Sequence, residues 1–530
     1  MPETDVVVLG SGAAGLSAAL TAGVGGAAVT VLEGSPLFGG TSAVSGGGMW
    51  LPGNTLDPAW TDSLAGAKVY LQRLTLGLTP DAIIDRYLAE SGQIPSFFAA
   101  HSPLTFTADI GRPDYHAPWE GSSLTSRTVF PTPYELPRLG ALEPLVRRPG
   151  PGGILPIQHS EEEALAASDD PDAINKLIRE RLAKGIALRG VALVGGLMEG
   201  CVAAGVSFVA QTRGRSLVVS DGRVVGVRAG SGVEYRARLG VILASGGFEW
   251  NRDLWDAFMG VPWDGPATPP VNQGDGLIMA AAAGAKLANL DKATWIPVRY
   301  SGEEYCDRPY VRSGGHGQMP GEIIVNTRGR RFTNETLNYN DIGRIMTHFD
   351  PALYEYDNHP SYVIGDRHTL ARLRAGGPAL GPDEGDGWVA ADTLREVADK
   401  LGIDAEGLSS QVAAFNRFAA DGVDPVFHRG EKPWEIHYLP GHRTIGPLVE
   451  GPFAGYRVRA GVFGTRGGPV INTDAQIVDF GGRPLPGLFG AGNVVAHPFA
   501  SAYPGGGGTL GPAVTFGHVA GKSVLLEGGS

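Results

Sequence analysis

The sequence predicts an α/β fold in which a parallel sheet carries a smaller α+β domain inserted late in the chain. The first observation is an unbroken apolar run, Val6 to Leu9, as expected of a strand buried on both faces. The second is that a glycine-rich turn, a helix of small residues and another apolar strand, Ala28 to Leu32, follow at once, which favours a parallel βαβ unit. The third is a change of composition near Asp291, after which aromatic residues and predicted loops become dominant.

The turn after the first strand has the spacing Gly-x-Gly-x-x-Gly. Such glycines permit a tight turn, close approach of a pyrophosphate and tight packing of helix on strand, while the helix N-terminus offers free N–H groups to phosphate. The second strand ends at Glu33, about 20 residues on, where a carboxylate can bind an unphosphorylated ribose. We therefore predict a Rossmann-like site for FAD or NAD rather than NADP; the alternative is a βαβ unit without a ligand. The predicted contacts in the turn are Gly10, Ser11, Gly12, Ala13, Ala14 and Gly15.

A second glycine-rich loop follows Glu33 and runs from Phe38 to Gly48. Glycine and hydroxyl residues this close to the second strand suit a cradle for a cofactor, because their backbone N–H groups can face an anion. The alternative is a flexible surface loop. The predicted contacts in this loop are Gly40, Thr41, Ser42, Gly46 and Gly47.

Length and charge narrow the function. A chain of 530 residues is too long for one core, so two or three domains are expected. The net charge of -12 and the lack of a basic stripe weigh against nucleic acid and anionic membrane partners. Cys201 and Cys306 are the only cysteines, which gives neither a disulfide framework nor a zinc spacing. With no signal-peptide pattern before Val6, we expect a cytoplasmic protein that binds no metal.

The middle of the chain predicts further elements of the first domain. The longest apolar stretch, Gly190 to Gly205, contains Glu199 and several glycines, so we expect a buried helix and no transmembrane segment. Ser220-Asp221-Gly222 predicts a hairpin turn. The other expected elements are a helix over Pro80–Ala100, a long loop over Ser122–Pro156, a helical pair over Arg179–Gly205 and a strand over Leu239–Leu243.

Two more glycine-rich segments follow apolar strands and are expected at the same cofactor. The first is Ala244-Ser245-Gly246, after the strand that ends at Leu243, with Asp275 at the start of a nearby helix as a further candidate. The second is Gly490-Ala491-Gly492-Asn493, also after a strand. Closer to the C-terminus, a run of four glycines from Gly505 opens a helix whose dipole could stabilise negative charge. The predicted contacts there are Gly492, Asn493, Gly508, Thr509 and Leu510.

These segments divide the chain into an interrupted cofactor domain and a cap. We expect residues 1–290 and 444–530 to form the cofactor domain, and residues 291–443 to form a catalytic cap over the cofactor. The cap is predicted to contain a strand, Ile323 to Val325, and two helices, Ala391 to Leu401 and Leu408 to Asp421.

Taken together, these motifs resemble the FAD-binding flavoproteins of the fumarate reductase and succinate dehydrogenase superfamily. The resemblance rests on the Gly-Gly-Thr-Ser loop at Gly39, on Ala-Ser-Gly-Gly-Phe at Ala244 and on Gly-Ala-Gly-Asn at Gly490. It implies FAD as the cofactor. Members with covalent flavin use a histidine in the first loop, which has none here, so the resemblance implies FAD held non-covalently.

The resemblance narrows at three tyrosine motifs, which are similar to those of the 3-oxosteroid 1-dehydrogenases. They are Pro113-Asp114-Tyr115, Leu337-Asn338-Tyr339 and Tyr503-Pro504-Gly505-Gly506-Gly507. The similarity implies that a double bond is introduced beside a ring ketone, as in 1,2-dehydrogenation of a 3-oxosteroid. Tyr503 and the Gly507 N–H would stabilise the enolate. Tyr339 would remove the α-proton with Tyr115 lowering its pKa, and a hydride would pass to the flavin.

The family pattern is not complete in this chain. Asn338 and Gly506 stand where the family commonly has proline, and Ser501 stands where it commonly has histidine. A dehydrogenase of smaller cyclic ketones therefore stays open. A fumarate-reductase-like enzyme is disfavoured because an apolar and aromatic stretch follows Asn493, where that branch keeps an arginine. A flavin-binding protein without turnover is the remaining alternative. An external electron acceptor is expected, since no second dinucleotide motif is present.

Overall fold

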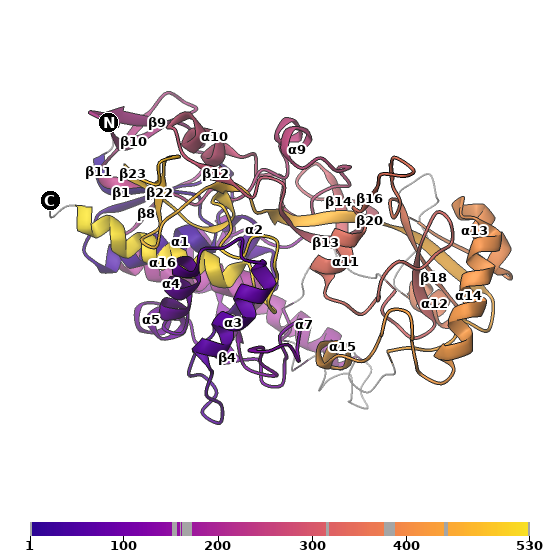
Figure 1. Cartoon of the computed structure of the whole chain (residues 1–530). Coiled ribbons are helices and arrows are strands. Elements are labelled where there is room, and N and C mark those ends of the chain that lie inside the picture. Colours follow the sequence, from indigo (N-terminus) through magenta and orange to yellow (C-terminus); the bar gives the residue numbers. More distant parts are fainter. Residues whose placement is uncertain are drawn as a thin grey trace.

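The computed structural model describes residues 3–150, 156–158, 161, 172–313, 317–375, 387–438 and 444–527. Figure 1 shows two parts joined side by side. One part contains the first strands, the last helix and both ends of the chain, and the other contains the segments drawn in orange. The α/β class and the inserted second part are confirmed.

A mainly parallel sheet organises the first part. The strands lie in the order β22-β23-β11-β1-β2-β8, with β9 and β10 continuing as an antiparallel hairpin from β11. The pairs of β1 with β11, β1 with β2, β2 with β8 and β11 with β23 are all parallel. The strands are β1 (Glu3–Leu9), β2 (Val29–Leu32), β8 (Ser207–Val209), β9 (Gly214–Ser220), β10 (Arg223–Ala229), β11 (Glu234–Leu243), β22 (Gln476–Val478) and β23 (Pro484–Gly490).

Two parallel helices, α1 (Ala13–Val24) and α16 (Leu510–Leu526), lie against each other beside this sheet. Small residues make the contact possible, since a Cβ on Gly517 would lie 2.4 Å from the Ala14 carbonyl oxygen. The Ser17 hydroxyl also donates to the Val514 carbonyl at 2.7 Å. Because the two helices run in the same direction, their N-terminal ends face the same side of the first part.

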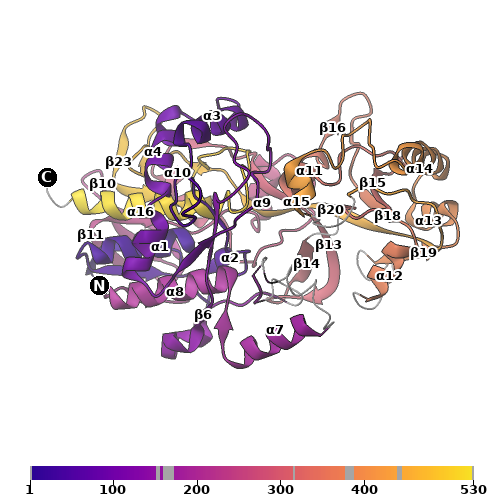
Figure 2. The same cartoon turned by 90° about the horizontal axis from the view of Figure 1, so that it is seen from below.

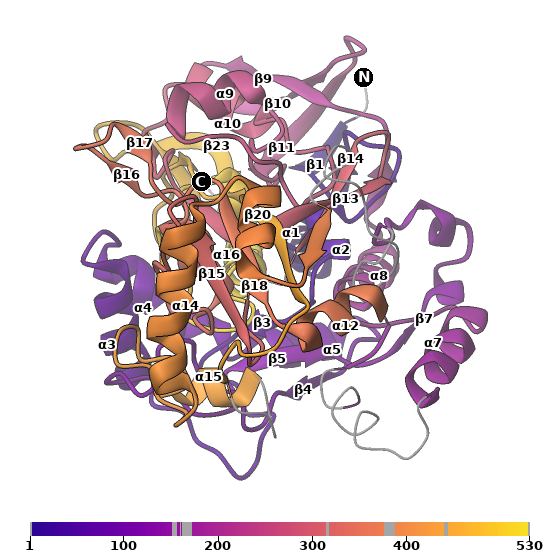
Figure 3. The same ribbon diagram turned by 90° about the vertical axis from the view of Figure 1, so that its right-hand side faces the viewer.

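The second part is built on an antiparallel sheet with strand order β14-β13-β20-β18-β15, and β19 also pairs with β20. Helices α13 and α14 cover one face of it through a buried apolar cluster (Figure 3). The elements are β13 (Ala293–Glu304), β14 (Pro309–Ser313), β15 (Glu322–Asn326), β18 (Ser361–Gly365), α12 (Arg367–Ala375), β19 (Trp388–Ala391), α13 (Leu394–Leu401), α14 (Ala405–Ala419) and β20 (Phe453–Thr465).

Several elements differ from the sequence prediction. The second sheet continues along β20 to Thr465, although the sequence placed the return to the first domain at 444. The helix expected over Pro80–Ala100 is divided into α4 and α5 at Gly92, where a Cβ would lie 2.4 Å from the Gly53 carbonyl oxygen. The loop expected over Ser122–Pro156 contains β5, β6 and a 3-10 helix, and residues 151–155 of it lie outside the described residues.

The hairpin β9–β10 and the buried helix over Gly190–Gly205, observed as α8, are confirmed. In the described part of the chain, no helix combines the length and apolar character needed to cross a bilayer. The remaining elements are α2 (Gly40–Ala43), β3 (Met49–Trp50), α3 (Leu64–Thr75), α4 (Asp81–Ser91), α5 (Ile94–His101), β4 (Phe106–Ala108), β5 (Thr128–Pro131), β6 (Tyr134–Glu135), η1 (Leu136–Leu145), α7 (Ala173–Ala183), β7 (Ile186–Ala187), α8 (Arg189–Ala203), α9 (Arg252–Phe258), α10 (Asp275–Ala282), β12 (Leu287–Ala288), α11 (Tyr339–Ile345), β16 (Phe349–Asp350), β17 (Glu355–Tyr356), α15 (Pro433–Tyr438), β21 (Gly468–Pro469) and η2 (Gly492–Val494).

Candidate active site

Three tyrosines from distant parts of the sequence meet where the two parts of the molecule join. The rings of Tyr115 and Tyr503 stack with centroids 5.7 Å apart and an interplanar angle of 13°. The ring of Tyr339 packs edge-on against both, 5.3 Å from Tyr503 and 6.0 Å from Tyr115. The structure thus brings together the three side chains that the sequence predicted for one site.

Two backbone contacts fix the position of Tyr503 relative to Tyr115. The carbonyl oxygen of Pro504 accepts a hydrogen bond from the Tyr115 N–H at 3.0 Å and another from the Tyr70 hydroxyl at 2.7 Å. The segments of Tyr115 and Tyr503 are therefore tied to one peptide group. Helix α3, which carries Tyr70, supports that group.

A buried carboxylate holds the loop that carries Tyr115. Asp114 accepts hydrogen bonds from the Trp50 indole and from Arg127 at 2.7 Å each, and from the Ser123 N–H at 2.9 Å. Because a buried carboxylate needs such partners, this network gives the loop one preferred position. The Asp in the Pro-Asp-Tyr motif is therefore a support for the neighbouring tyrosine.

Tyr339 occupies the first position of helix α11, and Asn338 caps that helix. The Asn338 side chain accepts from the N–H groups of Asn340 at 3.1 Å and Asp341 at 3.2 Å. Asparagine is among the best N-cap residues, so it fixes where the helix begins and hence where Tyr339 stands. Asn338, which stands where the family commonly has proline, therefore keeps Tyr339 in place.

Two aromatic residues at this site were missed from the sequence. Trp434 of α15 packs 4.2 Å from the Tyr115 ring, and Phe463 of β20 lies 5.7 Å from the Tyr339 ring. Figure 2 shows α15 and α11 at the junction of the two parts. The apolar alternation along β20 could have indicated Phe463, but Trp434 stands in a polar segment with no pattern to single it out.

Close backbone packing requires a glycine at position 507. A Cβ on Gly507 would lie 2.4 Å from the Gly48 carbonyl group, and the Gly507 φ of +87° disfavours other residues. The Gly507 N–H has no acceptor within the described residues, so it is free to bind a ligand.

Burial governs the electrostatics of the tyrosine cluster. It raises the pKa of Tyr339 well above its ordinary value, and the neighbouring hydroxyls of Tyr115 and Tyr503 raise that pKa further. This corrects the expectation that Tyr115 lowers the pKa of Tyr339: the contact among these hydroxyls stabilises the protonated form. Tyr339 is therefore protonated at neutral pH and donates a hydrogen bond within the cluster.

A buried arginine that the sequence analysis missed lies beside the cluster. The Arg466 guanidinium lies over the Tyr503 ring, and its Nη1 donates to the carbonyls of Ala500 and Ala502 at 3.0 and 2.5 Å. Its Nε donates to the Thr294 hydroxyl at 2.8 Å, whereas its Nη2 has no partner in the described residues. Burial lowers the pKa of Arg466 to about 10, which leaves it a cation at neutral pH.

The predicted dinucleotide site is assembled at the start of α1. Glu33 at the end of β2 accepts from the Ser11 hydroxyl at 2.5 Å, and the Ser42 hydroxyl accepts from the Ala13 N–H at 3.0 Å. Within the described residues, the N–H groups of Gly12, Ala14 and Gly15 have no acceptor. Free N–H groups at a helix start suit a pyrophosphate, and the neighbouring carboxylate suits a ribose.

The other predicted contacts surround this point. A Cβ on Gly10 would lie 2.4 Å from the Ala244 carbonyl oxygen, and a Cβ on Gly492 would lie 2.9 Å from the Ala14 side chain. Thr41 accepts from Asn272 at 3.0 Å. Asp275 differs from the prediction in one respect, since its carboxylate is bonded to Arg213 at 2.7 Å. For the other predicted contacts, binding to the cofactor stays a prediction; they are Gly40, Gly46, Gly47, Ser245, Gly246, Asn493, Gly508, Thr509 and Leu510.

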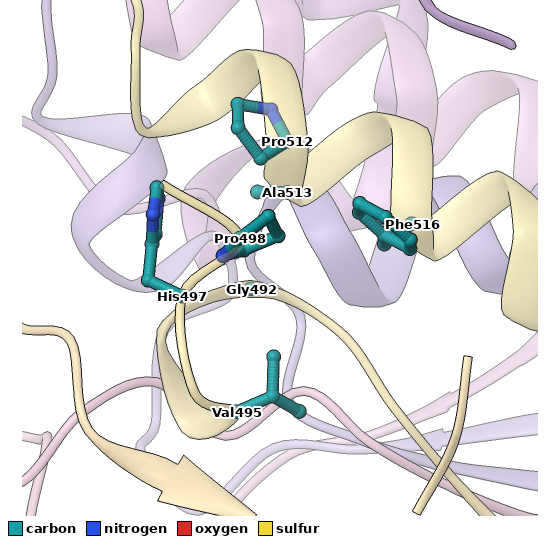
Figure 4. Close-up of a pocket in the computed structure, with 7 residues that line it drawn as sticks. All are labelled: Gly492, Val495, His497, Pro498, Pro512, Ala513 and Phe516. Atoms are coloured by element: carbon teal, nitrogen blue, oxygen red, sulfur yellow. The ribbon is translucent and has the colours of Figure 1, made fainter. Parts of the chain in front are cut away.

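A small pocket lies between the chain after β23 and helix α16 (Figure 4). Its lining includes His497, whose Nδ1 accepts from the Phe499 N–H at 3.1 Å, and burial lowers the pKa of His497 well below its ordinary value. Of the predicted cofactor residues, only Gly492 belongs to this lining. The pocket therefore borders the cofactor site and is separate from the three tyrosines.

Comparison with known proteins agrees with this geometry. Residues 5–510 match the family model described as FAD binding domain. The chain is 34% identical to 4-oxocyclohexanecarboxylate 2-dehydrogenase of Sinomonas cyclohexanicum, over 98% of this chain and 92% of the relative. It is 33% identical to 3-oxosteroid 1-dehydrogenase of Mycolicibacterium smegmatis, over 98% of this chain and 96% of the relative.

The structure is also similar to a solved one, the 3-ketosteroid delta1-dehydrogenase of Sterolibacterium denitrificans in complex with 1,4-androstadiene-3,17-dione. The TM-score is 0.89 at 29% sequence identity, with 99% of this chain and 100% of that chain covered. The chain belongs to the 3-oxosteroid 1-dehydrogenase family. It is an FAD-dependent oxidoreductase that acts on CH–CH donors.

The residues present fit FAD. The free N–H groups at the start of α1 and the Glu33 carboxylate provide for the pyrophosphate and the ribose of a dinucleotide. The parallel helix α16 begins at the same side of the sheet, seven residues after Tyr503. Its N-terminus would suit a negatively charged part of the cofactor.

Proposed function

We propose that this enzyme removes hydrogens from two adjacent carbons beside a ring ketone, which for a 3-oxosteroid is a 1,2-dehydrogenation. The observation that carries the proposal is the meeting of Tyr339 with Tyr503, four residues before a glycine whose N–H has no acceptor in the described residues. One hydroxyl and one N–H suit a carbonyl oxygen that becomes an enolate.

Each residue has a separate task in this reaction. The Tyr503 hydroxyl and the Gly507 N–H hold the ketone oxygen and stabilise the charge that develops on it. The Tyr339 oxygen takes the proton from the α-carbon, after the phenol has given its own proton to solvent. Tyr115 orients Tyr339, and Trp434 packs against Tyr115 and excludes water from it.

FAD supplies the acceptor for the hydride that leaves the β-carbon. We propose that FAD is held non-covalently by the starts of α1 and α16 and the glycine-rich loops, and that its electrons pass to an external acceptor. Denatured protein should then release FAD into the supernatant on acid precipitation, and flavin retained in the pellet would contradict the non-covalent attachment.

Two substrate classes are compatible with this chemistry. A 3-oxosteroid is supported by the relative at 33% identity and by the solved structure with a bound steroid. A single-ring ketone is the second candidate, supported by the relative at 34% identity, whose name specifies 4-oxocyclohexanecarboxylate.

The test is reduction of the bound flavin in the absence of oxygen. The reduction is monitored as a loss of flavin absorbance near its visible maximum. The holoenzyme is mixed in turn with 4-androstene-3,17-dione, with 4-oxocyclohexanecarboxylate and with succinate. We expect bleaching by at least one ring ketone and none by succinate. Bleaching by succinate alone would overturn the proposed reaction.

A further inference from the structure

We infer that Arg112 is a carboxylate-binding residue of the substrate site, and that the substrate is a ring ketone that carries an acid group. The inference rests on the proposed function and deepens it, because it selects a substrate class for the same site. Arg112 lies three residues before Tyr115 in the loop that Asp114 anchors.

The surroundings of Arg112 are aromatic. Its guanidinium carbon lies 5.8 Å from the ring centroid of Trp434, which itself covers Tyr115, and 5.8 Å from that of Phe130. Its Nη1 lies 3.5 Å from the position that a Cβ on Gly506 would take. The guanidinium therefore stands beside the residue that precedes Gly507, at the edge of the tyrosine cluster.

The hydrogen-bonding capacity of this arginine is only partly used. The side chain is 8% exposed, and its Nε donates to the Asp109 carboxylate. Neither Nη1 nor Nη2 has a partner in the part of the chain that the structure describes. A guanidinium has five N–H donors, and those on Nη1 and Nη2 are therefore available to solvent or to a ligand.

A neighbouring buried cation differs in its pairing. Arg127, which is also buried, has its nitrogens bonded to Asp62, Asp114 and the Gly121 carbonyl. Arg112 instead presents two adjacent nitrogens in the arrangement that binds a carboxylate with two parallel hydrogen bonds. A ligand with an acid group would complete it.

The position also suits a compact substrate with two polar ends. Gly506 and Gly507 are consecutive and the Arg112 guanidinium lies beside Gly506, so it lies near the N–H proposed for the ketone oxygen. A cyclohexanone with an acid group on the opposite carbon presents its two polar ends across one ring. A neutral steroid presents no anion for Arg112.

The test separates binding of the acid group from the reaction. Binding of cyclohexanecarboxylate, which has no ketone, and of its methyl ester is measured by isothermal titration calorimetry on the FAD-loaded wild type. The same titrations are made with Arg112→Gln, with Asp109→Asn and with Arg73→Gln. Arg73 is the matched control, because it is an exposed arginine that stacks over Trp119 at 3.8 Å.

We expect the wild type and Arg73→Gln to bind the acid more tightly than the ester, and Arg112→Gln to lose about 10- to 150-fold in affinity for the acid alone. Asp109→Asn should retain acid binding, because it removes only the protein partner of Nε. If Arg112→Gln weakens acid and ester equally, or if Asp109→Asn abolishes acid binding as fully as Arg112→Gln does, Arg112 is a structural ion-pair residue and the inference is wrong.

Turnover of 4-oxocyclohexanecarboxylate and of its methyl ester, with the flavin spectrum as readout, separates a failure of acid recognition from a failure of the proposed reaction. Loss of the preference for acid over ester in Arg112→Gln, with ester turnover retained, supports the inference. A wild type that oxidises only neutral 4-androstene-3,17-dione overturns the inference and leaves the proposed reaction standing. A wild type that oxidises no ring ketone overturns the proposed reaction itself.

Discussion

The guanidinium of Arg466 lies over the ring of Tyr503, with its central carbon 5.2 Å from the ring centroid. Both side chains are buried, and Tyr339 lies on another side of the same tyrosine. A buried cation favours an anion nearby, so Arg466 offsets the burial that disfavours a phenolate or an enolate here. A basic tyrosine in an apolar site needs such a charge.

Arg466→Gln should therefore lower turnover and move its pH dependence. Loss of the cation raises the pKa of Tyr339 further, so the rise of kcat/KM with pH should shift to higher pH. Arg466→Lys keeps the charge and should shift the profile less. Circular dichroism and flavin content establish that both variants fold. An unchanged profile in Arg466→Gln would show that the charge does not act on the base.

Tyr339→Phe should keep FAD and the fold but lose most of the turnover, by roughly 100- to 10,000-fold, as expected when a general base is removed. The substitution removes one hydroxyl and leaves the ring contacts with Tyr503 and Phe463 in place. Single-turnover reduction of the flavin measures the effect. Phe463→Leu, which changes the packing but no hydroxyl, is the control and should cost much less.

Tyr503→Phe should reduce kcat more than it weakens substrate binding, because a hydrogen bond to the ketone oxygen strengthens as negative charge develops. Loss of one such donor typically raises the barrier by about 3 to 4 kcal/mol. Steady-state kinetics with a ring ketone gives kcat and KM separately. A change confined to KM would assign Tyr503 to binding alone.

Gly507→Ala should destabilise the protein and also impair the reaction. The added methyl group would meet the Gly48 carbonyl group at 2.4 Å in a backbone region that disfavours alanine. Thermal unfolding and FAD retention should therefore both fall. Gly505→Ala gives a comparison, because its methyl group would meet the Trp50 and Asp114 side chains and not a backbone carbonyl. Full stability of Gly507→Ala would contradict this packing argument.

The stability of the enzyme should fall as the pH is lowered from about 6.5 towards 4. His518 on α16 is buried against α1 and Phe97, and burial lowers its pKa to about 4, with Lys522 and Arg86 acting in the same direction and Glu90 opposing them. A histidine in the unfolded chain binds a proton below a pH of about 6.5. As the pH falls, the unfolded state therefore binds a proton before the folded state does, and the folded state loses stability.

The loss assigned to His518 should reach up to about 3 kcal/mol in the free energy of unfolding. Urea unfolding at pH 7.5, 6 and 5 measures it. His518→Gln should be less stable at pH 7.5, because the contact with Thr21 at 2.8 Å changes, but its stability should depend less on pH. An equal slope in both proteins would place the titrating group elsewhere.

The cofactor side of the molecule was predictable because its signals are local. Gly10, Gly12 and Gly15 stand next to the strand and helix that they join, and Glu33 follows at a fixed spacing. The three tyrosines were found through their resemblance to a family, since nothing in their spacing along the chain shows that they meet. Arg466 and Trp434 could not be predicted, because their contacts depend on how β20 and α15 pack against distant residues. The end of the second sheet was missed for the same reason.

The tyrosine cluster is divided between the two parts of the molecule. Tyr503 and Tyr115 are tied to the first part through the Pro504 carbonyl, whereas Tyr339 and Trp434 come from the inserted segment. A hinge motion of that segment would carry away the base and the aromatic cover together and leave the ketone-binding donors with the cofactor. In such an open state the base would no longer face the ketone-binding donors, so proton transfer would stop and the product could leave.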